Sequence, residues 1–62
     1  MNGTIVMNNF KLSDYGLEIH DVGYFVFLDF IKLDTRQTTR IETNKEELKD
    51  MIYYLNKYLE SN

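Results

Sequence analysis

Two side chains near the middle of the chain have the spacing to share a metal ion. Glu18 and His20 lie two residues apart in "GLEIH", which alternates apolar and polar residues as a half-buried strand does. Side chains at this spacing point to the same side of a strand, where both could bind one divalent cation. With Asp14 as a further ligand, the set predicts a weak metal-dependent nuclease. A polar outer face of a strand has the same pattern, and we favour that interpretation. We therefore expect no catalytic residue, no bound metal and no cofactor, and a binding protein rather than an enzyme.

Asp29 is the only carboxylate within a largely apolar stretch, "GYFVFLDFIKL", which covers residues 23–33. One interpretation is a partly desolvated carboxylate with a raised pKa, placed in an interface or a binding site. The other is a carboxylate that hydrogen-bonds a Thr, Tyr or Lys on a neighbouring strand or lies toward solvent. The sequence favours the second interpretation.

A small basic group begins at the end of this stretch and predicts an alternative function. Lys32, Arg36 and Arg40 lie close to Tyr24 and Phe25 in the expected sheet. Aromatic side chains that stack on bases, together with cations that neutralise phosphates, are typical of surfaces that bind single-stranded nucleic acid. The chain has a net charge of −3 and a pI of about 4.9, which argues against general phosphate binding.

The pattern of apolar residues predicts the elements that position these side chains. Sixty-two residues form one domain, residues 1–62. Strands are expected over residues 3–8, 16–20, 24–33 and 38–43, and residues 8–16 read either as a loop or as a strand with a bulge. A helix from about Asn44 to Glu60 follows, opened by a capping box between Thr43 and Glu46. Its apolar stripe has helical spacing and consists of Leu48, Met51, Ile52, Leu55 and Leu59.

This order predicts an α+β fold: a four-stranded antiparallel sheet with one C-terminal helix packed on one face. The residues expected beneath the helix are Tyr24, Val26, Leu28 and Phe30. The other sheet face has no element left to cover it, and an exposed apolar patch usually marks an interface. The sequence therefore predicts a homodimer that buries Phe25, Phe27, Ile31 and Leu33.

Composition adds expectations about the environment and the source. Cysteine is absent, which excludes disulfides and thiolate metal sites. No signal-peptide pattern opens the chain, and its longest apolar run is too short to span a bilayer, so we expect a soluble, cytoplasmic protein without membrane contact. Ala, Pro and Trp are also absent while Asn, Lys, Ile and Tyr are plentiful. This bias is typical of AT-rich coding sequences, as in low-GC bacteria and their phages.

The order of elements, with the basic hairpin and the final "TRIETNKEELKDMIYYL", resembles the small single-stranded-DNA-binding domains of the transcriptional-coactivator type. The resemblance covers roughly Tyr24 to Leu59 and rests on pattern. It implies a homodimeric four-strand-plus-helix domain that binds single-stranded DNA. The chain departs from that family because it is acidic and lacks the dense Lys and Arg of the DNA-contacting strands.

In size, acidity and composition the chain also resembles the small anti-CRISPR and other host-directed inhibitors of phages and mobile elements. That resemblance implies a protein that acts in the host cytoplasm by stoichiometric binding to a host protein, with a CRISPR effector as one candidate. The residues expected to contact such a partner are Asp14, Glu18 and Asp21, which would enter a basic nucleic-acid channel, and Tyr53 as an exposed anchor.

Overall fold

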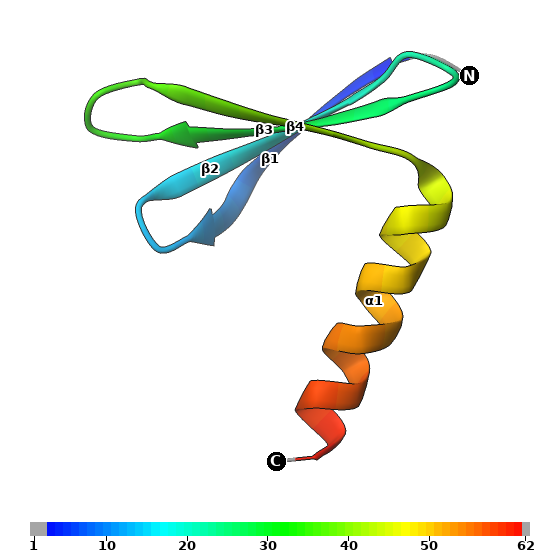
Figure 1. Ribbon diagram of the computed structural model, residues 1–62. Coiled ribbons are helices and arrows are strands. Elements are labelled where there is room, and N and C mark those ends of the chain that lie inside the picture. Colours follow the sequence, from blue (N-terminus) through cyan, green and yellow to red (C-terminus); the bar gives the residue numbers. More distant parts are fainter. Residues whose placement is uncertain (1–2, 62) are drawn as a thin grey trace.

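The computed structural model describes residues 3–61, with the side chains of all of these except residues 8 and 9. The outermost residues of the domain predicted over 1–62 lie outside the described residues. The elements follow the predicted order: β1 (Gly3–Leu12), β2 (Tyr15–Asp21), β3 (Val26–Lys32), β4 (Thr38–Thr43) and α1 (Lys45–Glu60) (Figure 1). The α+β class, with an antiparallel sheet and one C-terminal helix, is confirmed.

The four strands form a meander in the order β1-β2-β3-β4, in which every neighbouring pair is antiparallel. Short turns join consecutive strands, which is why each strand pairs with the next one along the chain. The register places Glu18 opposite Asp29 and Asp29 opposite Arg40. Three charged residues from three strands therefore lie in one row across the sheet.

The segment over residues 8–16 is a strand continuation with an irregularity. β1 pairs regularly with β2 as far as Met7, its register shifts between Met7 and Leu12, and Leu12 then pairs with Tyr15. The turn that follows contains Ser13, which has a left-handed backbone with φ of 58°. Of the two interpretations of this segment, the bulged strand is confirmed.

The turn before β3 is longer than the sequence predicts. Gly23 has the expected positive φ, 102°, and its N–H donates to the Asp21 carboxylate at 2.9 Å. The Val22 N–H donates to the Phe25 carbonyl at 3.0 Å, so the turn extends through Phe25 and β3 begins only at Val26. Tyr24, expected beneath the helix, is instead 91% exposed in this turn.

The N-cap of helix α1 is one residue later than the capping box predicts. Thr43 still belongs to β4, and its hydroxyl donates to the Glu47 carboxylate at 2.9 Å. Asn44 is the N-cap, with its side-chain oxygen accepting from the Glu47 N–H at 2.8 Å. A single residue, Asn44, thus connects the last strand to the helix.

The helix descends away from the sheet rather than lying across it (Figure 1). Among the described residues, only Val26 and Leu28 are buried apolar side chains, at 3% and 8% exposure. None of the helical residues is buried. The prediction that the apolar stripe of the helix covers one face of the sheet is therefore wrong for a single chain. The single connecting residue restricts how the chain can turn between β4 and α1, and from it the helix runs away from the sheet.

Candidate functional site

The strand register divides the sheet into two faces of different chemistry. The face we call the apolar face carries Ile5, Met7, Leu17, Ile19, Val26, Leu28, Phe30 and Ile41. The opposite face, here the polar face, carries Thr4, Val6, Glu18, His20, Phe27, Asp29, Ile31 and Arg40. The alternation along each strand produces this division, since neighbouring residues point to opposite sides.

A connected group of polar side chains crosses the polar face. Arg40 donates from Nε and Nη2 to the two oxygens of Asp29 at 2.8 and 2.9 Å. His20 Nε2 lies 3.2 Å from Asp29 Oδ2 and 3.1 Å from Glu18 Oε1, while its Nδ1 lies 3.0 Å from the Thr4 hydroxyl. Each of the four strands contributes at least one polar group, so this cluster links all four strands.

Arg40 lowers the pKa of Asp29 in this cluster. Its hydrogen bonds and positive charge hold the pKa of the Asp29 carboxyl below its ordinary value, against the opposing effect of burial. The same ion pair raises the pKa of Arg40. Asp29 is 95% shielded from solvent and yet fully paired. The interpretation of Asp29 as a carboxylate with a raised pKa is therefore wrong, and the partner on the neighbouring strand is an arginine rather than Thr, Tyr or Lys.

The metal-binding hypothesis is met in part by this geometry. Glu18, His20 and Asp29 each offer one ligand atom, and these atoms lie within 4.8 Å of one another. Glu18 and His20 point to the same side, as their spacing predicts, but the third group is Asp29, whereas Asp14 lies in the β1–β2 turn. Both Asp29 oxygens already accept from Arg40, whose charge opposes a cation. The cluster is thus satisfied as an internal network.

The three basic residues of the nucleic-acid hypothesis do not converge. Arg40 lies on the polar face and is paired with Asp29. Lys32 falls on the other face, with its ammonium 5.8 Å from the centre of the Tyr15 ring. Arg36 is in the β3–β4 turn, with a left-handed backbone at φ of 63°. The structure therefore gives these cations no shared surface.

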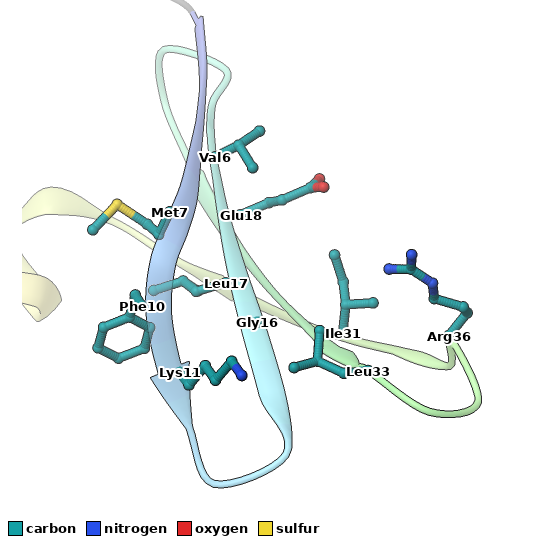
Figure 2. A pocket seen from close by; sticks show the side chains of 10 residues that line it. All are labelled: Val6, Met7, Phe10, Lys11, Gly16, Leu17, Glu18, Ile31, Leu33 and Arg36. Carbon is teal, nitrogen blue, oxygen red and sulfur yellow. The ribbon is translucent and has the colours of Figure 1, made fainter.

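Arg36 instead borders a shallow hollow at one end of the polar face (Figure 2). Figure 2 shows Ile31 and Leu33 beside Arg36, with Lys11 extending from the end of β1 and Val6 and Glu18 higher on the same side. Sequence reasoning missed Lys11 because it left residues 8–16 without an assigned structure. Lys11 lies within the stretch of β1 over which the register shifts, just before Leu12 pairs again with β2.

The acidic residues expected to contact a partner are also dispersed. Asp14 lies in the β1–β2 turn and is exposed, while Glu18 is occupied with His20 on the polar face. Asp21 is at the far end of β2, where its Oδ2 lies 3.5 Å from Lys45 Nζ. The hydrogen bond from the Gly23 N–H lowers the pKa of the Asp21 carboxyl. Tyr53 is exposed on α1 and makes an edge-to-face contact with Tyr54, with ring centres 5.3 Å apart.

The four residues expected in a dimer interface do not form a continuous apolar surface. The Arg40 guanidinium lies over the Phe27 ring at 4.7 Å, and Ile31 lies in the hollow. Phe25 and Leu33 flank β3 at its two ends and are exposed. Because the charged cluster separates them, the polar face is a poorer apolar interface than the sequence indicates.

Uncovered apolar side chains gather instead on the apolar face and on the helix. Ile5, Met7 and Ile41 on the edge strands are exposed, and Leu12 and Phe30 border a second hollow at the end of the same face. On α1 the stripe residues Met51, Ile52, Leu55 and Leu59 are 46–67% exposed. These two surfaces, an open sheet face and an unpacked helix stripe, are the strongest candidate binding surfaces among the described residues.

No helix in the described part of the chain has the length and apolar character needed to cross a membrane. Comparisons with protein-family models, with curated proteins and with solved structures found no match. The function is therefore inferred from the chain's own surfaces.

Proposed function

We propose that this protein is a non-catalytic interaction module that acts by stoichiometric binding. The observation that carries the proposal is the large amount of apolar side chain left in solvent on the apolar face and the helix stripe. Monomeric proteins rarely expose contiguous apolar patches of this kind unless the patch binds something. The polar groups of the sheet, by contrast, are paired with one another, which leaves no unpaired acid, base or nucleophile in the described cluster.

We further propose that the target is a host protein that handles nucleic acid, as for the small anti-CRISPR inhibitors that the sequence resembles. The net charge of −3 suits a target with a basic surface. RNA-guided nucleases hold their heteroduplex in such a positively charged channel. An acidic protein that occupies this channel would exclude the nucleic acid without any chemical step.

A titration against purified RNA-guided nucleases of low-GC bacteria tests this proposal. A binding inhibitor makes cleavage fall linearly with added protein until a fixed molar ratio, and preincubation beyond the binding time adds nothing. An enzyme that modifies or degrades a component would instead inhibit at substoichiometric amounts and progressively with time. Full cleavage activity at a molar excess across the panel would remove the nuclease-directed part of the proposal.

The single-stranded nucleic-acid alternative predicts a different result and is measured in parallel. Fluorescence anisotropy of a labelled oligonucleotide, at low and at physiological salt, would report binding that weakens steeply as salt rises. The dispersal of Lys32, Arg36 and Arg40 favours no binding even at low salt. Tight, salt-sensitive binding would make the coactivator-like function the better proposal.

A further inference from the structure

A single chain of this protein is more open than a compact protein of its size. Its accessible surface is 5285 Å², about 1,100 Å² more than the roughly 4,200 Å² expected for a folded monomer of 7.4 kDa. Its radius of gyration is 12.9 Å, against about 10.6 Å for a compact chain of 62 residues. The excess surface is slightly larger than one partner's share, about 800 Å², of a standard stable interface.

Helix α1 contributes to this openness, and its apolar stripe has no packing partner within the chain. It has 16 residues, and none of them is buried. Isolated helices shorter than about 12–15 residues are marginal in water, and most of the stability of a helix in a protein comes from packing of its apolar stripe. The stripe of α1 is well formed but faces no sheet of its own chain. Something outside the chain must supply the apolar surface that this stripe lacks.

The sheet has the complementary deficit on its apolar face. Ile5, Met7 and Ile41 remain exposed there, and Leu17 and Ile19 between them are only half-buried. Two-layer α+β folds cover such a face with a helix. The chain thus carries an open sheet face and an uncovered helix, each of the kind that the other would normally cover, and the two do not meet within one molecule (Figure 1).

We propose that a second copy of this chain closes both surfaces, by a reciprocal exchange in which the α1 stripe of each copy packs on the apolar face of the other. A two-fold axis makes the exchange self-completing, since each copy gives and receives one helix. The area is consistent with this exchange: if the dimer buries the excess of about 1,100 Å² on each chain, the total of about 2,200 Å² is within the range of obligate homodimer interfaces. The polar face, with its paired charges, stays outside.

This dimer differs from the one that the sequence predicts. Phe25, Phe27, Ile31 and Leu33 are not its interface, because the apolar face and the α1 stripe take that role. The inference uses the molecule's own surfaces and does not rest on the proposed host target. A pure protein therefore tests it without any partner.

Cysteine cross-linking tests the geometry directly, because the chain has no cysteine of its own. Chains with Ile5→Cys are mixed with chains carrying Leu55→Cys, allowed to exchange, and treated with a short bismaleimide. Reciprocal packing predicts a sheet-to-helix cross-link, which must join two chains since each carries one cysteine. Lys57→Cys, on the opposite side of the helix, is the matched control and should react at least about tenfold more slowly with Ile5→Cys.

Sedimentation equilibrium supplies the second measurement. The wild type should sediment at twice its 7.4 kDa chain mass. Leu55→Asp should raise the dissociation constant by about 100-fold or more, because each dimer loses two buried apolar contacts. Tyr53→Asp, a similar apolar-to-acid change at an equally exposed position on the far side of α1, should leave it within about threefold.

Three outcomes overturn the inference. They are a wild type that is monomeric at high micromolar concentration, a Leu55→Cys chain that cross-links only to itself through helix–helix contact, and a dimer that Leu55→Asp does not weaken. A monomer that still inhibits a nuclease stoichiometrically would defeat the dimer and leave the proposed function standing. A dimer with no nuclease target would do the reverse.

Discussion

The two faces of the sheet satisfy their side chains in different ways. On the polar face, Asp29 is almost completely buried, yet both of its oxygens accept hydrogen bonds from Arg40. On the apolar face, Val26 and Leu28 are buried while the side chains around them remain in solvent. A buried charge that is left unpaired costs much free energy, so it is paired within the chain. An exposed apolar patch, by contrast, usually marks a surface that binds a partner. The comparison indicates that the charged cluster of the polar face is satisfied within one chain, whereas the apolar face is left largely uncovered.

The largest expected effect is on the apolar face. Leu28→Ala should lower the free energy of unfolding by about 2–5 kcal/mol, because it removes a buried side chain and leaves a cavity. A domain of this size has a total stability of only about 5 kcal/mol, so this variant should be largely unfolded. Urea denaturation followed by circular dichroism measures the change.

Ile41→Ala, at the cross-strand neighbour of Leu28, sharpens the same comparison. Ile41 is exposed in one chain, so its loss should cost little in dilute solution and more at concentrations at which the dimer forms. A cost that is independent of protein concentration would show that Ile41 stays in solvent.

The next prediction concerns the Arg40–Asp29 ion pair on the polar face. Arg40→Met leaves the buried Asp29 carboxylate without its main partner and should lower Tm by about 5–10 °C in a domain of this size. Asp29→Asn should lower Tm less, because an amide oxygen still accepts a hydrogen bond and the half-exposed Arg40 remains hydrated. Thermal unfolding of both variants tests the asymmetry, and equal losses would contradict it.

The stability of the wild type at acid pH should depend on the same ion pair, between Asp29 and Arg40. The pKa of Asp29 is lowered in the folded protein, chiefly by Arg40, so below about pH 4 the unfolded chain binds a proton that the folded chain does not. Stability from this group is therefore complete above the ordinary Asp pKa and is lost as pH falls through the folded value. Tm measured from pH 5 downward should fall less steeply in Asp29→Asn. Identical slopes in both proteins would show that Asp29 does not contribute.

A smaller effect concerns the link between sheet and helix. Asn44→Ala removes the oxygen that accepts from the Glu47 N–H and should cost about 1 kcal/mol. Asn44→Asp, which keeps an acceptor at the cap, is the matched control and should retain the helix. Far-ultraviolet circular dichroism during urea denaturation compares them. If the alanine and aspartate variants lose helix together, the cap is not what holds the helix start.

The smallest effect is a baseline for the others. Lys49 and Glu46 form an exposed ion pair at 3.6 Å on the outside of α1. Exposed pairs of this type contribute little, so Lys49→Gln should leave Tm unchanged within error. A clear fall in Tm would mean that this side of the helix is also covered in the assembled protein.

The sequence predicts the elements well because their signals are local. The period-2 alternation in "GLEIH" and the helical spacing from Leu48 to Leu59 depend only on neighbouring residues, and both elements are confirmed. The same alternation correctly places Glu18 and His20 on one side of the sheet.

What the sequence leaves open depends on longer-range geometry. The pairing of Asp29 with Arg40 requires the β3–β4 register, which the turn sets: the Lys32 N–H donates to the Gln37 carbonyl at 2.8 Å. The position of Lys11 depends on the bulge in β1. The direction of the helix depends on the backbone conformation at Asn44, where β4 ends and α1 begins. None of these features has a periodic signal in the sequence.

The one-residue connection at Asn44 also has a consequence for the cell that makes this protein. In the dimer proposed above, a helix that is stabilised by the second chain would couple folding to expression level, because dimer formation follows mass action. Newly made chains at low abundance would expose their helices to proteases and be cleared. A burst of synthesis would carry the population past the dissociation constant and protect it. The protein would then respond to its own dosage as a threshold, present in quantity or almost absent.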